Sequence, residues 1–464
     1  MGPGPFPASV AQSTLEPQLP ADQTRYPDSS VFYRNLRRTF PEVERGEGCW
    51  LVDTSGKRYL DAAGGAMVVN LGHGVAEIGD AMAAQARRVA YVNGTAFTSA
   101  PVERMARELC SRSPAYGKVY FLGSGSESIE AALKLARQHW VERNKLSKHR
   151  VIALTPGYHG NTMLALSTSA REQYRTLYKE WLVDVIRIPA PYSYRCSCAG
   201  AADCNVCTGD VLEEAILEAG ADSIAAFVAE PVGGSSTGAN VPRPGYFERI
   251  REICDKYDVL FIADEVLSGA GRTGTWLALD RWNVRADIVT LGKGISGGYV
   301  PLSAVLATEE VVAPIAAGSG YFVHGQTFSH HAVTCAAGVA TLAYMDEHRL
   351  LQRVCEMAPV LHDALSALRE YPEVGDVRGR GLLAAVEFVA DGETRAPMAR
   401  SRKFAERFTQ AAQEAGLIVW PNVGHADGVN GDLVMIAPPF VIDRSEIEEI
   451  VRRFRTALDA CAAT

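Results

Sequence analysis

The sequence predicts an α/β fold with a mostly parallel sheet flanked by helices, and three observations predict it. Short apolar segments alternate with helical segments from about residue 118 to residue 307. Polar and charged residues directly follow these segments, as they do where parallel strands end at one edge of a sheet. From about residue 331 the pattern changes to long helices followed by strands, which is typical of a separate, smaller α+β unit.

The predicted elements follow one another with short turns between them. A hairpin at 49–61 precedes helices at 76–92 and 102–111. The seven strands of the main sheet are predicted at 119–122, 150–154, 184–188, 225–229, 259–263, 287–291 and 302–306. The helices between them are predicted at 125–145, 171–180, 210–219 and 244–257. Beyond these, helices at 331–345 and 350–369 precede strands near 381–388 and 433–436.

These elements predict four parts of the chain. Residues 1–28 are rich in proline and are expected to form a flexible N-terminal arm. Residues 71–330 are expected to form the large domain, which holds the main sheet. The smaller domain is expected to combine an N-terminal part, residues 29–70, with a C-terminal part, residues 331–464.

The composition is that of an ordinary globular protein and excludes several partners. The chain has 464 residues, of which 47% are hydrophobic and 22% are charged, and its net charge is −8. A negative chain offers no electrostatic case for nucleic acid or an anionic membrane. No apolar run approaches the roughly 20 residues of a membrane span, and the N-terminus has no secretory or myristoylation pattern. Ten scattered cysteines fit a reducing compartment, so we expect a cytoplasmic protein.

A lysine and an aspartate stand at the ends of two predicted strands. Asp264 follows the apolar run at 259–263, and Lys293 follows the run at 287–291. Taken singly, Lys293 reads as a solvated loop residue and Asp264-Glu265 as a helix N-cap. Together at one sheet edge, an amine and a carboxylate suit an aldehyde cofactor with a basic ring nitrogen, which is pyridoxal phosphate (PLP). Lys293 and Asp264 are therefore the predicted catalytic residues.

Other turns after predicted strands offer groups for the rest of such a cofactor. Gly123-Ser124-Gly125-Ser126 stands before a helix, where free backbone N–H groups bind phosphate, although Ser124 and Glu127 also have the spacing of a capping box. Tyr158, in Tyr158-His159-Gly160, is placed to stack on a ring. Glu230 ends another strand, and Thr327 precedes the helix at 331–345. Each also fits an ordinary role, as a solvated carboxylate and a loop threonine.

Four cysteines lie close together in the sequence with the spacing C-x-C-x5-C-x2-C. They are Cys196, Cys198, Cys204 and Cys207. Four such thiols are able to bind zinc tetrahedrally, and the second pair has the usual spacing while the first does not. The pattern favours a cysteine-rich surface insertion with reduced thiols, and structural zinc is the alternative. In either case the cluster is structural, because nothing catalytic surrounds it, and no catalytic metal is expected.

The ordered set of motifs resembles the class III aminotransferases, which are fold-type I PLP enzymes, from about residue 30 to the C-terminus. The motifs are Gly125-Ser126, Tyr158-His159-Gly160, Glu230-Pro231, Asp264-Glu265-Val266, Lys293-Gly294 and His324-Gly325-Gln326-Thr327. The Gly-Ser-Gly-Ser run at 123–126 is similar to the amine:pyruvate branch of the family. The resemblance implies the seven-stranded sheet and the smaller domain described above.

The resemblance implies a role for the residues around the cofactor ring. Lys293 binds the aldehyde covalently and moves the substrate proton, and Asp264 pairs with the ring nitrogen. Tyr158 packs on the ring, and His159 and Val266 belong to the cofactor site.

The resemblance also implies a phosphate site shared between subunits. Ser124, Gly125 and Ser126 hold the phosphate, and Thr327 reaches the phosphate of the neighbouring subunit. The protein is therefore expected to be a homodimer or a dimer of dimers with shared active sites. Glu230 matches a gating glutamate of members that act on ω-amino acids.

The activity implied by the resemblance is transfer of an amino group from a primary amine or ω-amino acid to a keto acid such as pyruvate or 2-oxoglutarate. A PLP-dependent decarboxylase or aminomutase on the same scaffold is the alternative. A regulatory PLP-binding protein would need a DNA-binding domain and a basic patch, and the net charge of −8 argues against it.

One feature of the family does not match. Members often carry a carboxylate-binding arginine at the position of Trp420 or near Met435, and the nearest arginines in the sequence are Arg407 and Arg444. Arg378 and Arg380 are possible substitutes, although a structural turn before a strand is favoured for them.

Four residues are the candidate substrate contacts: Met67, Tyr158, Glu230 and Trp420. Met67 falls where some relatives that act on amines have a pocket tryptophan. Met67 and Trp420 together offer an adaptable apolar pocket, unless both simply fill the core. Such a pocket favours an amine or a bulky ketone over a dicarboxylic acid.

Overall fold

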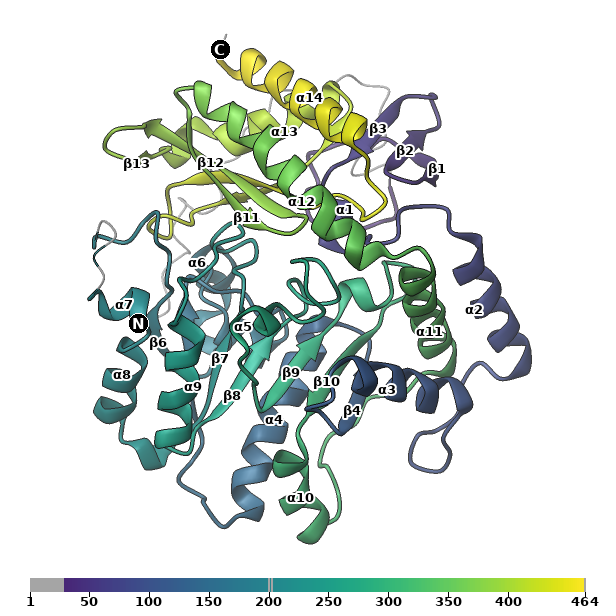
Figure 1. Cartoon of the computed structure of the whole chain (residues 1–464), viewed down its shortest axis with the longest axis vertical. Coiled ribbons are helices and arrows are strands. Elements are labelled where there is room, and N and C mark those ends of the chain that lie inside the picture. The colour runs from purple at the N-terminus through teal and green to yellow at the C-terminus, as the bar shows by residue number, and fades with distance from the viewer. Residues whose placement is uncertain (1–28, 199–200, 202, 463–464) are drawn as a thin grey trace, which may run out of the picture.

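Seven strands form the central sheet of the computed structural model, which describes residues 29–198, 201 and 203–462. Their order is β4-β10-β9-β8-β7-β5-β6. β10 is antiparallel to both neighbours and the other pairs are parallel, so the predicted α/β fold with a mostly parallel sheet is confirmed (Figure 1). The strands are β4 (Lys118–Leu122), β5 (Arg150–Thr155), β6 (Ile186–Pro189), β7 (Ile224–Ala229), β8 (Leu260–Asp264), β9 (Ile288–Leu291) and β10 (Ser303–Ala307).

Both faces of this sheet are buried. Along β8, Phe261 and Ala263 belong to one hydrophobic cluster and Leu260 and Ile262 to another, because successive side chains of a strand point to opposite faces. On one face lies α4 (Gly125–Glu142), and β8 also contacts α9 (Tyr246–Lys256), while α8 (Val211–Ala219) packs on β6. A parallel sheet covered on both faces is built from nearly continuous apolar runs, which is why the sequence predicted these strands well.

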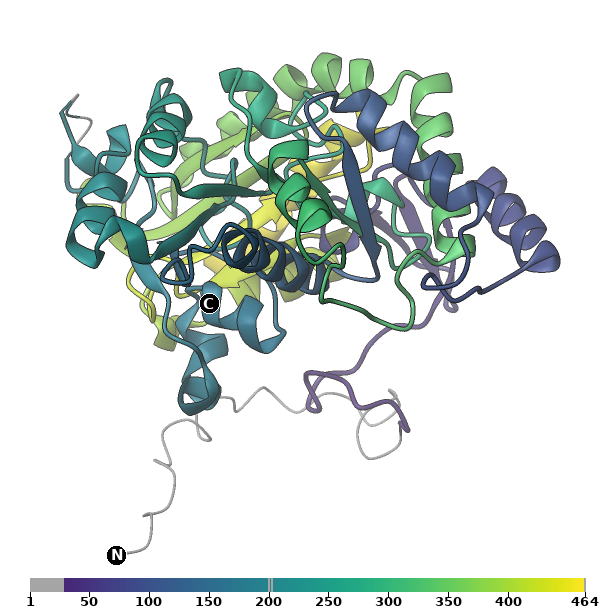
Figure 2. The same ribbon diagram turned by 90° about the horizontal axis from the view of Figure 1, so that it is seen from below.

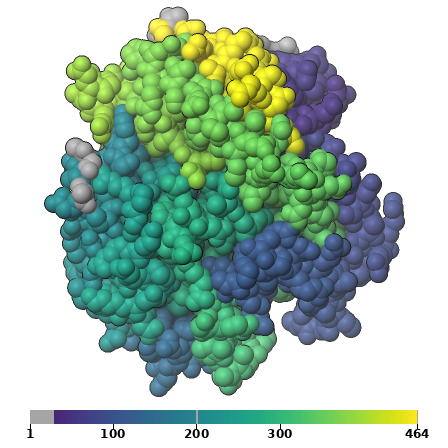
Figure 3. Space-filling model, viewed as in Figure 1, coloured from purple at the N-terminus to yellow at the C-terminus, as the bar shows by residue number. Residues whose placement is uncertain are grey.

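An N-terminal and a C-terminal segment of the chain meet in a second sheet, ordered β1-β2-β3-β14. A third sheet, ordered β11-β12-β16-β15 with β13 paired to β12, lies next to it. Figure 3 shows the purple N-terminal and the yellow-green C-terminal segments together above the teal central part. The strands are β1 (Val43–Glu47), β2 (Trp50–Asp53), β3 (Arg58–Asp61), β11 (Val374–Arg380), β12 (Leu383–Asp391), β13 (Ala396–Pro397), β14 (Leu417–Ile418), β15 (Trp420–Val423) and β16 (Asp432–Ile436). The domain boundaries given above stay a prediction.

The remaining helices surround these sheets. Helix α11 (Ala332–Glu347) packs against α2 (Ala76–Arg88) and α3 (Ala100–Arg112) at one end of the molecule (Figure 2). Helix α14 (Arg444–Ala462) packs against α12 (Leu350–Ser366) and α13 (Phe404–Glu414). Helix α10 (Glu309–Ala317) lies on α4. The short helices are α1 (Gly64–Met67), α5 (Met163–Thr168), α6 (Glu172–Arg175) and α7 (Asn205–Thr208).

Several local expectations differ from the structure. Strands β1 and β11 were not predicted. Arg378 and Arg380 lie in β11, which pairs with β12 across a tight turn at Gly381 (φ +61°), so the turn expected at these arginines is wrong. Charged residues and glycines hide β11 from a pattern search. The helix expected at 171–180 is the short α6 followed by a 3-10 turn at Thr176–Trp181.

Two expectations fall at the limits of what the structure describes. The arm predicted at residues 1–28 lies outside the described residues. Among the helices of the described part, none has the length and apolar character needed to cross a membrane.

Candidate active site

The candidate site lies at the carboxyl edge of the central sheet. Strands β5, β7, β8 and β9 are parallel neighbours, so their carboxyl ends meet at this edge. Tyr158 and His159 follow β5, Glu230 follows β7, Asp264 ends β8, and Lys293 follows β9. Ligands of open α/β sheets bind outside this edge. The topology therefore brings together residues that are up to 135 positions apart in the chain, from Tyr158 to Lys293.

Asp264 is a buried carboxylate held by three donors. Its Oδ2 lies 2.8 Å from Nδ1 of His159. Its Oδ1 accepts from the hydroxyl of Thr290 and from the backbone N–H of Val266, each at 3.2 Å. Nε2 of His159 is buried and meets no hydrogen-bond partner in the part of the chain that the structure describes. A carboxylate fixed in this way is ready to receive one further donor from a bound group, such as a protonated ring nitrogen.

Lys293 is a buried amine whose charge is disfavoured. Burial lowers the pKa of Lys293 to about 8, against the opposing pull of the carboxylates Asp264 and Glu230. Its backbone is left-handed (φ +44°), which is uncommon for a residue with a side chain and strained. Within the described residues, no hydrogen bond or ion pair engages its Nζ. An amine with a lowered pKa is a nucleophile near neutral pH.

Glu265, the residue next to Asp264, has a structural role. Glu265 is fully buried, and its carboxylate accepts from the Ser268 hydroxyl and from the backbone N–H groups of Ala278 and Leu279. Burial raises the pKa of Glu265 to about 7. The helix N-cap considered for the Asp-Glu pair is wrong, because no helix begins directly after it. Glu265 instead binds the start of the 3-10 turn Ala278–Trp282, and Asp264 is left for the site.

The N-terminus of α4 offers donors to an anion. Ser124 is the N-cap, and its hydroxyl accepts from the N–H of Glu127, while the Glu127 carboxylate accepts from the N–H of Gly123. The N–H groups of Gly125 and Ser126 meet no acceptor within the described residues. The cap uses the N–H groups of Gly123 and Glu127, so those of Gly125 and Ser126 stay available to an anion and the two roles are compatible.

Two glycines bring the backbone close around this helix end. A Cβ on Gly125 would lie 2.8 Å from Cγ1 of Val266, and one on Gly160 would lie 2.3 Å from Oγ of Ser126. Gly160 also has φ +129°, which favours glycine. The start of α4 is thus pressed against the segments that follow β5 and β8. The free amides, the carboxylate and the amine fit the phosphate, ring nitrogen and aldehyde of PLP.

Glu230 is held by backbone donors. Its Oε2 accepts from the N–H of Tyr158 at 3.0 Å, and its Oε1 accepts from the N–H of Gly234 at 2.8 Å. Burial raises the pKa of Glu230. The carboxylate therefore fixes the backbone that carries Tyr158, whose own ring lies 6.2 Å from that of Tyr174.

Thr327 lies apart from these groups. It is exposed in the loop between α10 and α11, beside Phe328, which is 65% exposed. None of the described contacts joins it to the residues at the sheet edge of its own chain.

The two positions expected to hold an arginine are neighbours in the structure. Trp420 in β15 stands directly opposite Met435 in β16. Met435 is fully buried, and Met67 is 3% exposed in the main core, which matches the core reading of Met67. Trp420 is half-buried against the same core.

Arg378 is unavailable as a substitute. Its guanidinium bonds both Glu387 (2.7 Å) and Asp376 (2.9 Å). The same Glu387 also contacts Arg195 and His425, and the guanidinium of Arg378, with that of Arg195, holds the pKa of Glu387 well below its usual range despite its burial. Arg380 is exposed at the end of β11.

Arg171 is a functional candidate that the sequence did not reveal. It is 9% exposed and donates to Oγ of Ser235 (3.1 Å) and to the side-chain oxygen of Asn422, but no carboxylate of the described residues lies within 4.0 Å. Asn422 is two residues from Trp420 on β15, so both side chains lie on one face of the strand. A single arginine in a polar turn belongs to no sequence motif that would predict a binding role. Only the tertiary structure shows that Arg171 is buried without an acidic partner.

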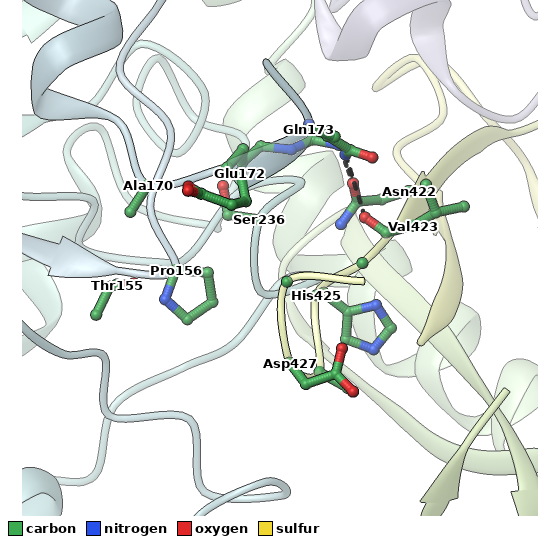
Figure 4. A pocket seen from close by; sticks show the side chains of 14 residues that line it. Thr155, Pro156, Ala170, Glu172, Gln173, Ser236, Asn422, Val423, His425 and Asp427 are labelled. Atoms are coloured by element: carbon green, nitrogen blue, oxygen red, sulfur yellow. Dashed lines mark hydrogen bonds between the residues drawn. The ribbon is translucent and has the colours of Figure 1, made fainter. Parts of the chain in front are cut away.

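Arg171 lines a cavity of about 300 Å³ next to the sheet edge (Figure 4). Burial lowers the pKa of Arg171, while Tyr174, Tyr158 and Glu230 oppose the shift. None of Tyr158, Glu230, Asp264 and Lys293 is among the lining residues of this cavity. The link from the cavity to the sheet edge is Arg171 itself, whose Cζ lies 6.0 Å from the centre of the Tyr158 ring. The guanidinium has neutral partners, Ser235, Asn422 and the ring of Tyr174 at 4.5 Å, and a buried cation that lacks a carboxylate partner suits an anionic ligand.

Comparisons with known proteins agree with this geometry. A family model described as aminotransferase class-III matches residues 32–458. An uncharacterised aminotransferase of Bacillus subtilis is 37% identical, over 92% of this chain and 96% of its own length. The putrescine–pyruvate aminotransferase of Pseudomonas aeruginosa is 34% identical, over 91% of each chain. The PLP-bound amine transaminase of an uncultivated Pseudomonas species has a TM-score of 0.86 and 32% identity, with 96% of this chain and 100% of that chain covered.

Proposed function

This chain belongs to the class-III aminotransferase family, and from that membership we propose roles for the residues around Lys293. It is a PLP-dependent enzyme of fold type I that moves an amino group from a primary amine or ω-amino acid to a keto acid such as pyruvate or 2-oxoglutarate. The observation that carries the proposed roles is the buried amine of Lys293, with its lowered pKa, at the same sheet edge as the carboxylate of Asp264.

Lys293 and Asp264 act on the reacting atoms. When bound, PLP supplies an aldehyde carbon and a protonated ring that takes up the electron pair of a broken C–H bond. Lys293 would hold the aldehyde carbon, and its neutral amine would take the Cα proton of the substrate and return it one carbon away. Asp264 keeps the ring nitrogen protonated, and His159 and Thr290 orient its two oxygens.

The remaining groups position the cofactor. The free N–H groups of Gly125 and Ser126, with the hydroxyl of Ser124 nearby, bind the phosphate at the positive end of α4. Tyr158 packs on the ring from the segment that Glu230 fixes. Val266 closes the site against the start of α4.

The substrate meets an apolar side and a cationic side. Trp420 provides the apolar contact, with Tyr158 and Glu230 at the entrance. Arg171 binds the carboxylate of the keto acid and replaces the arginine that relatives carry at the position of Trp420 or near Met435. Its planar guanidinium is able to bind a carboxylate through two parallel hydrogen bonds, and its neighbours Ser235 and Asn422 are neutral.

We also propose that the active form is a homodimer and that it works in the cytoplasm. Thr327 stands on a surface with exposed Tyr321, Val323 and Phe328, where a partner would bring it to the second phosphate site. The ten cysteines form no disulfide, which fits a reducing compartment.

A single half-reaction tests the proposed roles. Holoenzyme is mixed with one amine at a time, without keto acid, and the visible absorbance of the bound aldehyde is followed. If the enzyme transfers the amino group of the amine, this absorbance should fall while a carbonyl product is released. The absorbance should recover when a keto acid is added. Lys293→Ala should abolish the change, whereas Lys118→Ala at an exposed ion pair should not.

Two results would contradict the proposal. If Lys293→Ala still turns over, Lys293 is not the acting base. If carbon dioxide or a rearranged amine is formed without keto acid, the decarboxylase or aminomutase would replace the aminotransferase.

A further inference from the structure

The four clustered cysteines meet in space at the short helix α7, near one edge of the molecule (Figure 1). Sγ of Cys196 lies 3.6 Å from Sγ of Cys204, and Sγ of Cys198 lies 3.7 Å from Sγ of Cys207. All four sulfur atoms lie within 4.8 Å of one another. Residues from both ends of the segment 196–207 thus converge on one point.

These distances fit a tetrahedral metal site better than disulfides. A zinc–sulfur bond of about 2.3 Å places the sulfurs of a regular tetrahedron about 3.8 Å apart. A disulfide needs about 2.05 Å between sulfurs, far shorter than either pair. Two of the six sulfur–sulfur separations are close to this value and none exceeds 4.8 Å, so the four thiols are already gathered around a common centre that suits Zn²⁺.

A cation outside the cluster fits the charge of such a site. Four thiolates around Zn²⁺ carry two net negative charges. Nη2 of Arg243 lies 4.0 Å from Sγ of Cys198, and its Nη1 donates to the carbonyl of Ala201 at 2.8 Å. Arg243 therefore offsets part of the negative charge of the sulfurs and also binds Ala201, which lies between the two cysteine pairs.

The segment around the cysteines has little regular secondary structure to stabilise it. Among the described residues between the end of β6 at Pro189 and the start of α8 at Val211, only the short helix α7 is regular. Long irregular segments are uncommon inside compact domains unless something holds them. This one carries Tyr192 and Arg195, which bond the buried Glu387 of β12 and so join the central sheet to the C-terminal sheet.

We propose that Cys196, Cys198, Cys204 and Cys207 bind one zinc ion as a structural site. Each thiol gives its proton to solvent and binds as a thiolate, with no oxidation or reduction. Four protein ligands complete the tetrahedron and leave no position for water, so the ion fastens the segment and takes no part in amino transfer. The zinc alternative that the sequence left open is thereby preferred over reduced thiols.

Metal analysis of the purified holoenzyme tests the proposal. The full chain is produced in zinc-containing medium, dialysed against a chelator to remove loosely held metal, and analysed by mass spectrometry of the elements. The expected result is about one zinc per chain. The double variant Cys204→Ser/Cys207→Ser should lose it, and Cys355→Ser, at an exposed cysteine outside the cluster, should keep it.

A second measurement on the unmodified protein does not depend on a variant that folds. The four thiols should resist alkylation until a reagent that captures zinc releases the metal, and Co²⁺ in place of zinc should show the charge-transfer bands of four thiolates. The variant without zinc should melt at a lower temperature, yet keep its amino-transfer activity at low temperature.

Several outcomes would overturn the proposal. Zinc retained equally by the double variant would mean adventitious metal only. Iron in place of zinc, or an intact mass that shows two disulfides, would assign a different chemistry to the cluster. Rapid alkylation of all four thiols in the untreated protein would leave them as reduced thiols.

Discussion

At the residue scale, Lys293 combines burial with a strained backbone. Its left-handed conformation costs on the order of 1–3 kcal/mol, and it is kept only where the surroundings demand it. Here the chain must leave β9 and at once point an amine toward Asp264. The same burial lowers the pKa of the amine from 10.5 to about 8.

This pKa predicts how cofactor-free enzyme recaptures PLP. Only the neutral amine attacks the aldehyde, so the capture rate should rise about tenfold per pH unit below pH 8 and level off above it. The measurement is the growth of visible absorbance between pH 6 and 10. A free lysine derivative in the same buffers corrects for the ionisation of PLP itself. A rate that keeps rising to pH 10 would show an ordinary, exposed lysine.

Arg171 is proposed to bind the carboxylate of the keto acid rather than to act on the reacting atoms. Burying a guanidinium with only neutral partners costs free energy, and a bound substrate carboxylate would offset that cost by pairing with it. Removing a hydrogen bond to a charged group costs about 1.5–3 kcal/mol.

Arg171→Leu should therefore raise the KM for the keto acid about ten- to a hundredfold. The first half-reaction with an amine that lacks a carboxylate should change little, because that donor does not need the guanidinium. Arg380→Gln is the matched control, since Arg380 is exposed at the end of β11. Steady-state kinetics with the two substrates varied separately decide the question. An equal loss for both substrates would point to misfolding rather than to carboxylate binding.

At the element scale, the start of α4 fits tightly against the end of β8. Val266, two residues beyond Asp264, fills the space where a side chain at Gly125 would stand. The phosphate site and the carboxylate are thus held at a fixed separation by one packing contact between two elements.

Gly125→Ala should disturb this contact and loosen PLP. Overpacking costs about 1–3 kcal/mol, which should appear as faster loss of the cofactor during dialysis. Val266→Ala in the same chain should restore much of the retention, because it removes both methyl groups that the new Cβ meets. Gly79→Ala in α2 is the control, because nothing lies within 4 Å of its Cβ. Failure of the double variant to recover would place the defect elsewhere.

At the scale of the whole molecule, one surface of the single chain is unusually apolar. Exposed side chains from two distant segments gather there, and the rings of Tyr91 and Phe328 lie 6.2 Å apart. Phe97, which is 68% exposed, and His330 line one groove. Such a patch beside Thr327 is typical of an interface between subunits.

Phe328→Asp should split the proposed dimer and abolish most activity, because each site would lose the threonine of its neighbour. Sedimentation should show the mass of one chain where the unmodified protein shows two. Leu217→Asp on α8, where Leu217 is 60% exposed, carries the same kind of change on another surface and should stay dimeric. A fully active single chain would refute the shared site.

Much of the fold and the cofactor site could be predicted because both rest on short-range patterns. The strands of a sheet buried on both faces are apolar runs, and the residues at their ends are adjacent in sequence to those runs. Asp264, Lys293 and Ser124–Ser126 were predicted in this way, and the structure places each of them at or just beyond the end of a strand. Strand β11 was missed because its charges and glycines suit the buried pairs of Arg378 and Glu387 rather than an apolar face.

The sequence by itself determined the fold class, the family and the residues that suit the cofactor, since motifs and periodicity are local. Only the tertiary structure decided which charged side chains are already paired and which are not. Arg378 is neutralised by Glu387, from the next strand of its hairpin, whereas Arg171 is buried without a carboxylate. Likewise, only folding shows that four cysteines converge within 4.8 Å. Pairing and convergence depend on distances between segments remote in the chain, which no local pattern encodes.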